Sequence, residues 1–420
     1  MSILLTTCYY LYTRKAIPFD YFSQKYNVRI IVGLLFTCVI CFGITVFHQR
    51  YDIVLLKVFV IQFEMLCALM YALPLLIPKE DENKAFERAS LIICYAFTLQ
   101  GAIQLSGFFI PAWGDFLISM KPQEMQDVLL EGGITHPFRG YSLSGSPFFE
   151  LPAGFGIAFI LLFRLVATEG QQYLSRKMVY TMIFFFFIGS LFSGRTAFIG
   201  IIMAFIMGLF FMKKEFSSLL KTFYQSIILL LLFFVSYFFL PQFIQDRMQN
   251  EVFPFAFEGF YNYSELGEFR TLSTDVMIEK HYYMLSEKTF ILGDGQYIND
   301  SGANYYGETD AGYMRSILYG GVFFSLLLIV YQLLYFFQPF VISYVDINNK
   351  ESWRDFICLL FLFLHLFILE YKGETIGRQN ITMAILLFVC TAYITRYYHQ
   401  LKSSNYELTT RNLKKVTNVV

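Results

Sequence analysis

Apolar residues gather in long runs along the chain, and shorter polar stretches separate these runs. Runs of about 18 apolar residues, enough to cross a hydrocarbon core about 30 Å thick, recur. A segment that crosses lipid must satisfy its own backbone hydrogen bonds, so each run is expected to be helical. The pattern predicts an all-α, polytopic integral membrane protein with about ten spans: 30–47, 53–77, 90–110, 149–167, 178–192, 196–212, 222–240, 314–338, 355–370 and 380–395.

Composition supports this prediction. The chain has 420 residues, of which 56% are hydrophobic and 20% aromatic, and a soluble domain cannot cover that much apolar surface. The 32 basic and 32 acidic residues cancel, so the net charge says nothing about partners. Residues 1–420 show no internal repeat and no separate soluble domain, and we expect a single membrane domain.

The distribution of Lys and Arg predicts the orientation of the spans. One set of span ends carries 19 of these residues, whereas the short connections on the other side carry four. Because cytoplasmic loops are rich in Lys and Arg, both termini are expected to be cytoplasmic, with residues 1–12 on the cytoplasmic interface. Two long loops, 111–148 and 241–313, then lie on the opposite side, where loops of this length usually carry function.

The second long loop is the more structured one in its sequence pattern. Ser264 is expected to start an amphipathic helix on the membrane face, and Gly293 to end it. Arg270 and His281 are 11 residues apart, about three helical turns, and therefore share one face of that helix. A polar, glycine-rich stretch follows and leads to Asp310 at the start of the next span.

Arginines recur near the outer ends of the spans, where the orientation rule makes them scarce. Guanidinium groups bind phosphate oxygens in pairs and stay charged, so arginines that converge here suit a lipid-linked pyrophosphate. A set of unrelated arginines that snorkel to the interface is the alternative. The outer residues are Arg139, Arg195, Arg270, Arg315 and Arg378.

Few polar residues lie within the spans. Glu64 is near the middle of its span, where a carboxylate is costly and is usually partnered or functional. His365 is expected to pack between helices, and Arg164 and Lys57 are expected to snorkel from span ends. The five His form no ligand-spaced pair and the Cys all lie in apolar segments, so we expect no bound metal.

The order of motifs resembles a known family. A tight hairpin, Ser193-Gly194-Arg195-Thr196, precedes a large loop that contains "LGDGQY" and then "TDAGYMRSILYGGVFF". In this order the chain is similar to the Wzy-type O-antigen polymerases and the related O-antigen ligases. The similarity covers most of the chain in topology and residues 193–196 and 270–322 in motif.

The resemblance implies a GT-C-type glycosyltransferase that is inverting, independent of metals and without a cofactor. Its donor and acceptor would be undecaprenyl-pyrophosphate-linked glycans. Arg195 and Arg270 match the two arginines that hold the pyrophosphate in that family. The ligases carry a His-Asn-x-Tyr-like segment where this chain has Asp310-Ala-Gly-Tyr313, which favours a polymerase and leaves the catalytic base open between Asp310 and His281.

The resemblance has further implications. It places the protein in the bacterial inner membrane with its active site facing the periplasm, and implies a chain-length regulator and a flippase as partners, with no nucleic acid. Tyr313, Gly293 and Gly295 are expected to contact sugar or shape the site.

Three alternatives stay open, the last of which is a structural or regulatory membrane protein. The first is an O-antigen ligase, which moves finished glycan to lipid A–core. The second is a flippase or transporter of the lipid-linked repeat. A flippase should place charged residues along the interior of several spans, whereas Glu64 is essentially the one mid-span charge in this chain.

Overall fold

The computed structural model describes residues 25–131, 136–143, 149–167, 174–211, 237–299, 305–345, 349–375 and 380–417, together with residues 224, 231 and 235. Helices and helical turns make up the named elements of these residues, and one isolated β-bridge joins Ile298 to Tyr305. Seven of the helices are long and apolar enough to cross a membrane. The predicted all-α class and the membrane-spanning character of the chain are therefore confirmed.

The bundle helices follow the predicted spans closely. The helices are α3 (Lys25–Phe47), α4 (Val54–Leu76), α5 (Ala85–Phe109), α8 (Glu150–Val166), α9 (Arg176–Ser193), α10 (Ala197–Phe210), α17 (Gly312–Val345), α18 (Lys350–Lys372) and α19 (Asn380–Thr417). They coincide with nine of the ten predicted spans, although α8 and α10 are shorter than the other seven. Most of the tenth predicted span, 222–240, lies outside the described residues.

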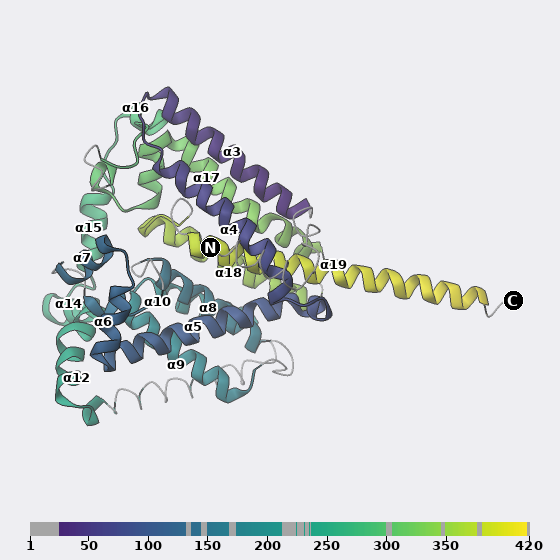
Figure 1. Ribbon diagram of the computed structural model, residues 1–420, viewed down its shortest axis with the longest axis horizontal. Helices are drawn as coiled ribbons and strands as arrows, with labels where there is room; N and C mark the ends of the chain where they lie inside the picture. The colour runs from purple at the N-terminus through teal and green to yellow at the C-terminus, as the bar shows by residue number, and fades with distance from the viewer. Residues whose placement is uncertain are drawn as a thin grey trace.

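Two groups of helices flank α18 and α19 (Figure 1). One group consists of α3, α4 and α17, and the other of α5, α8, α9 and α10. Within the second group α8 is buried almost all round, since it packs against α5, α9, α10, α18 and α19. Protein, rather than lipid, therefore surrounds this 17-residue helix.

Small residues allow α8 and α10 to approach closely. Gly156 on α8 faces Gly200 on α10, and a Cβ atom on either glycine would overlap the backbone or side chain opposite. His365 of α18 lies beside Gly156, is fully buried, and places its Nε2 atom 3.3 Å from the carbonyl oxygen of Ala153. The prediction that His365 packs between helices is confirmed.

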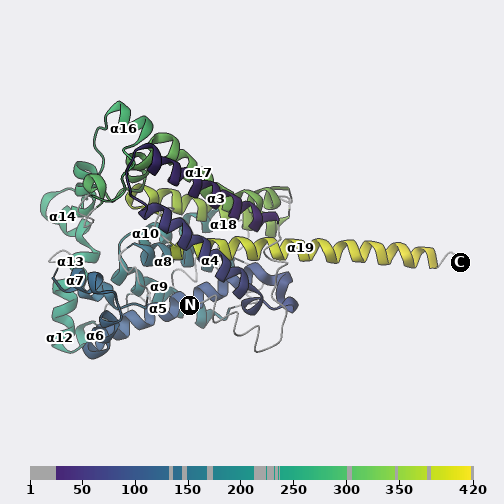
Figure 2. The same ribbon diagram turned by 45° about the horizontal axis from the view of Figure 1, so that its top comes forward.

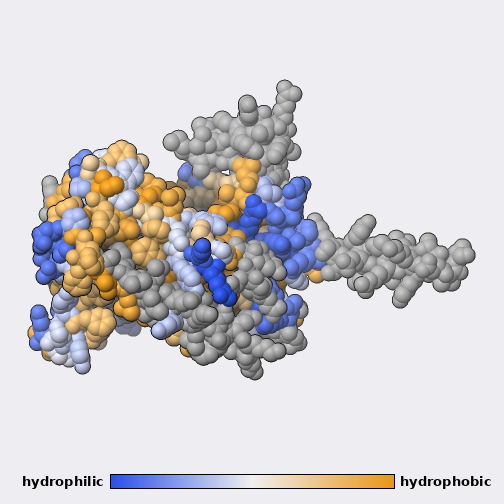
Figure 3. Space-filling view, turned by 90° about the horizontal axis from the view of Figure 1, so that it is seen from below, coloured by the Kyte–Doolittle hydropathy of each residue, from blue (hydrophilic) through white to orange (hydrophobic). Residues whose placement is uncertain are grey.

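The two ends of the bundle differ in structure. The helices of both long loops gather at one end, which we call the loop end, while α19 projects from the other, which we call the α19 end (Figure 2). Hydrophilic residues gather around the base of α19, next to a largely apolar surface (Figure 3). The loop helices are α6 (Pro111–Ser119), α7 (Gln123–Glu131), α12 (Gln242–Arg247), α13 (Phe253–Ala256), α14 (Glu258–Leu266), α15 (Leu272–Val276) and α16 (Glu287–Leu292).

The single amphipathic helix predicted from Ser264 to Gly293 is wrong. Ser264 lies inside α14, which ends at Gly267 because that residue takes a left-handed conformation with φ of 73°. New helices then begin after the capping residues Thr271 and Ser286, whose side chains accept backbone hydrogen bonds. Gly293 does end a helix, as predicted, but that helix is the short α16.

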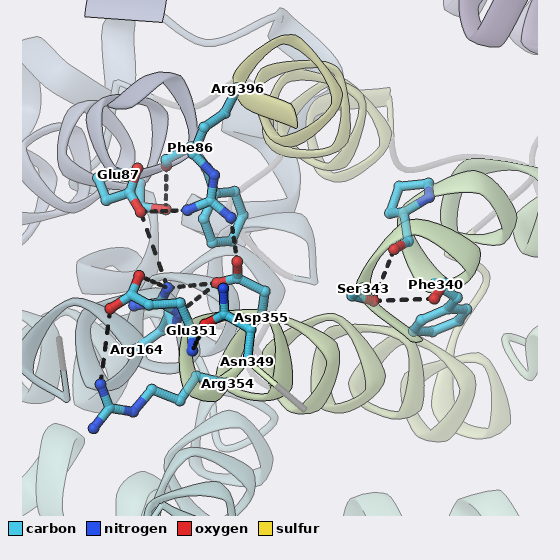
Figure 4. Close-up of polar contacts among 12 residues, drawn as sticks. Phe86, Glu87, Arg164, Phe340, Ser343, Asn349, Glu351, Arg354, Asp355 and Arg396 are labelled. Atoms are coloured by element: carbon cyan, nitrogen blue, oxygen red, sulfur yellow. Dashed lines mark hydrogen bonds and ion pairs between the residues drawn. The ribbon is translucent and has the colours of Figure 1, made fainter. Parts of the chain in front are cut away.

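Buried ion pairs tie four helices together near the α19 end (Figure 4). Asp355 of α18 accepts hydrogen bonds from Arg164 of α8, with an Nε–Oδ1 distance of 2.7 Å, and from Arg396 of α19. Arg396 also pairs with Glu87 of α5. We call these residues, together with Glu351 and Arg354, the buried ion network.

The prediction that Arg164 snorkels is wrong, because its side chain is only 1% exposed within the buried ion network. Lys57 is exposed on α4, as a snorkelling side chain should be. Glu64 lies on the exposed surface of α4, and none of the described residues forms a hydrogen bond or ion pair with it.

A break in α17 anchors the second loop. The helix is interrupted at Gly320 and Gly321, where Gly321 has φ of 74°. A break at this point leaves the carbonyl groups of the preceding residues without helical partners, and two backbone N–H groups of the second loop donate hydrogen bonds to them. Asp294 N lies 2.7 Å from Leu318 O, and Gly295 N lies 3.0 Å from Tyr319 O.

Candidate functional site

Arg195 lies in the short turn between α9 and α10, next to the loop helix α14. The helix α9 ends at Ser193 and α10 begins at Ala197, so Gly194, Arg195 and Thr196 form the turn. Arg195 has the one long side chain among these residues. The Arg195 guanidinium pairs with the carboxylate of Glu258, at the start of α14. The single arginine of the hairpin thus meets a residue from the second loop.

Arg139 lies next to Arg195. It belongs to the helical turn η2 (Pro137–Gly140) and donates from Nε to the carbonyl oxygen of Ser193, 3.1 Å away. The guanidinium carbons of Arg139 and Arg195 lie 5.0 and 5.2 Å from the ring centre of Phe255, so they are at most about 10 Å apart. Burial and the positive charge of Arg195 lower the pKa of Arg139.

Lys372 is the third cation of this group. It is the last residue of α18 and lies within electrostatic range of Arg195, Arg139 and Glu258. We call Arg139, Arg195 and Lys372 the cation cluster, with Glu258 as its counter-ion. Among the described residues of this group three cations face one carboxylate, a balance that favours an anionic ligand.

Arg315 belongs to a second, neighbouring group. Its Nη1 atom lies 3.1 Å from the carboxylate of Glu374, and the guanidinium stacks on the rings of Tyr297 and Tyr305. The Tyr297 hydroxyl also donates to Glu374. Burial raises the pKa of Glu374, and the charge of Arg315 and the Tyr297 hydrogen bond oppose this shift. The Arg315 side chain is only 4% exposed, so its charge neutralises the buried Glu374 carboxylate and is not presented at the surface.

The turn after α18 joins the two groups. Lys372 and Glu374 are two residues apart, so their Cα atoms lie within about 7.6 Å of each other. The Glu370 carboxylate holds the turn from the other side, because it accepts hydrogen bonds from the backbone and the hydroxyl of Thr375. The Arg315–Glu374 pair therefore fixes the turn that holds Lys372 within electrostatic range of Arg195.

The two candidate bases lie together at the same end. The backbone N–H of Asp310 donates to Nδ1 of His281 over 3.3 Å, and the Thr309 hydroxyl donates to the His281 carbonyl oxygen. Tyr282 stacks on Tyr371 with a ring separation of 4.7 Å, and donates to its carbonyl oxygen. Since Tyr371 precedes Lys372, the pair of candidate bases lies near the cation cluster.

The hydrogen bond from Asp310 N determines the state of the His281 ring. A nitrogen that accepts a hydrogen bond carries no proton, so neutral His281 holds its proton on Nε2. The Asp310 carboxylate is exposed and no described residue binds it. The geometry therefore leaves Asp310 free to accept a proton and His281 disposed to donate one.

Arg270 differs from the other arginines. It is exposed and pairs with Glu268 and Asp275, each at 3.0 Å, and these hydrogen bonds raise its pKa. Its segment nevertheless contacts the cation cluster, because Glu258 also accepts a hydrogen bond from the backbone of Leu272.

The other predicted site residues have separate positions. Tyr313 donates to the Phe367 carbonyl oxygen on α18, 2.9 Å away. Gly293 and Gly295 have positive φ angles and pack against Gly320 and His48, so they anchor the loop to the bundle. Arg378 lies outside the described residues.

Sequence reasoning missed Glu258, Lys372 and Glu374. A signal for Lys372 was present, because it is one of the four rare positive charges in the short outer connections. Glu374, two residues later, shares that connection. No feature of the sequence distinguished Glu258, because acidic residues are frequent in the second loop.

Comparison of the chain with protein-family models, with curated proteins and with solved structures finds no match. The geometry of the loop end is therefore the main guide to function.

Proposed function

We propose that this protein is a Wzy-type O-antigen polymerase, a GT-C-type glycosyltransferase of the bacterial inner membrane. It joins undecaprenyl-pyrophosphate-linked repeat units of O-antigen or a similar surface polysaccharide at the periplasmic face. The observation that carries this proposal is the cation cluster. Arg139, Arg195 and Lys372 come from three distant segments and converge at the loop end, and Tyr282, next to the candidate base His281, stacks on Tyr371, next to Lys372.

In the proposed reaction the cation cluster binds the pyrophosphate of the growing chain. A sugar hydroxyl of the incoming repeat attacks the anomeric carbon, and its oxygen forms the new glycosidic bond. The bond between that carbon and the pyrophosphate oxygen breaks, and both of its electrons stay on the leaving group. The cluster stabilises the charge that develops there, and attack opposite the leaving group inverts the anomeric centre.

Asp310 is the proposed base of this reaction. Its exposed carboxylate accepts the proton of the attacking hydroxyl, while His281, with its proton on Nε2, orients the acceptor by donating a hydrogen bond. The proposal thus assigns the two residues different roles. Arg315 is assigned to positioning, because Glu374 and two tyrosine rings already surround it.

The test is polymerisation by purified protein supplied with one defined lipid-linked repeat. The wild-type protein should form a ladder of longer glycans. Arg195→Ala should abolish the ladder while the protein still inserts and folds, and Arg195→Lys should also be poor because an ammonium group lacks the paired donors. Normal polymerisation by Arg195→Ala would rule out the assignment of the pyrophosphate to the cation cluster.

A deletion strain separates the alternatives. Loss of a polymerase leaves lipopolysaccharide capped by a single repeat, loss of a ligase leaves bare core, and loss of a flippase strands the repeat inside the cell. We expect the single-repeat product. A bare core would identify a ligase instead.

A further inference from the structure

Glu258 is the carboxylate that pairs with Arg195 in the cation cluster and lies within electrostatic range of Lys372. One of its carboxylate oxygens pairs with Nη1 of Arg195, and the other lies 2.6 Å from the backbone nitrogen of Leu272. Its side chain is about a quarter exposed, at 24%, so the carboxylate is held from two sides but is not sealed off from solvent. An anion that binds Arg195 through its Nη1 atom must therefore replace this carboxylate.

We propose that Glu258 is an internal counter-ion that competes with the anionic ligand for Arg195 and speeds release of the cleaved leaving group from the site. The inference rests on the proposed function for the identity of that leaving group, a lipid pyrophosphate. Glu258 acts through Arg195 and is thus a positioning residue.

The need for such a residue follows from charge. The donor carries a pyrophosphate diester, and cleavage of the sugar–oxygen bond converts it into a monoester with an additional negative charge. The product therefore binds three cations more tightly than the donor does. A carboxylate that returns to Arg195 replaces the product in its ion pair, so product release leaves fewer uncompensated cations behind.

Glu258→Gln isolates this role. The glutamine amide oxygen can still accept the hydrogen bond from Leu272, so the attachment between α14 and α15 is kept. The negative charge opposite Arg195 is lost. Glu265→Gln is the matched control, because it removes a carboxylate from the exposed surface of the same helix.

The first measurement is binding of inorganic pyrophosphate to the full-length protein in detergent, by calorimetry. Removing a partly exposed ionic competitor should tighten binding about three- to tenfold in Glu258→Gln, and leave Glu265→Gln like wild type. A merely structural role for Glu258 predicts the opposite, weaker binding. Glu258→Asp, which keeps the charge but shortens the side chain, should give an intermediate affinity and serves if Glu258→Gln does not fold.

The second measurement compares a single turnover with repeated turnovers on the lipid-linked repeat. Glu258→Gln should slow the later turnovers more than the first transfer, with stronger inhibition by added undecaprenyl pyrophosphate. Equal or weaker pyrophosphate binding in Glu258→Gln would overturn the counter-ion role, whatever the enzyme does. If Glu258→Gln binds pyrophosphate more tightly but the wild-type protein does not polymerise, the counter-ion role stands and the proposed function fails.

Discussion

The two ends of the bundle differ in how their charged side chains are balanced and buried. Near the α19 end, the buried ion network sets three carboxylates against three guanidinium groups, and most of its side chains are almost inaccessible. At the loop end, the cation cluster has three positive groups and one carboxylate, which is partly exposed. Balanced charge that is buried holds helices together, whereas unbalanced charge near the surface is available to a ligand.

Breaking the buried ion network should have the largest effect on stability. Asp355→Asn leaves Arg164 and Arg396 without their shared carboxylate inside the bundle. We expect a loss of about 5 kcal/mol in the free energy of unfolding, measured by titration with SDS, and little folded protein in cells. Wild-type stability of Asp355→Asn would mean that the network does not hold α8, α18 and α19 together.

Arg315 is expected to have the second-largest effect. Although it lies at the loop end, its pairing with buried Glu374 resembles the buried ion network. Arg315→Met should cost about 3 kcal/mol, because the Glu374 carboxylate is left buried without its cation. The double variant Arg315→Met/Glu374→Leu should lose less than the sum of the two single changes, in the same SDS titration. Additive losses would show that the pair does not interact.

Arg195→Ala should change stability by no more than about 1 kcal/mol, because its ion pair with Glu258 is partly exposed. Binding of inorganic pyrophosphate should nevertheless fall by at least about tenfold, since Arg195 offers paired donors to phosphate. Calorimetry and SDS titration on the same preparation separate the two effects. A large loss of stability with unchanged binding would reverse the contrast between the two ends.

The smallest effect is expected for Asp81→Ala, which breaks an exposed ion pair with Arg88 at the α19 end. Both side chains are more than a third exposed, so the expected loss is about 0–1 kcal/mol. This variant is the matched control for Asp355→Asn, since both remove an aspartate that faces an arginine. If the two variants lose equal stability, burial is not what distinguishes the network.

The spans were predictable because each one shows its character locally, as a run of apolar residues. The partners of Arg164 were not, because Asp355 lies 191 residues away in the chain and only packing brings the two together. Arg164 near a span end therefore suggested snorkelling, although the structure buries it.

At the loop end, local pattern identified Arg139 and Arg195 but could not sort the arginines by role. Arg315 and Arg195 are both single arginines beside apolar spans, and only the three-dimensional partners distinguish them. The prediction of a single helix in the second loop was wrong for a different reason. Gly267 is a strong helix-stop residue, but the helix start predicted at Ser264 precedes it and the helical spacing of Phe269, Leu272, Val276 and Tyr283 follows it, which together suggested one helix.

The break in α17 has a consequence for anyone who wishes to shorten this protein. The carbonyl groups of Leu318 and Tyr319 accept hydrogen bonds from the Asp294–Gly295 turn, so part of this span is completed by atoms from the loop. Deleting that loop would leave two backbone acceptors without donors inside the bundle. The smallest chain that inserts correctly therefore includes the turn, and excision of the loop would damage the span as well.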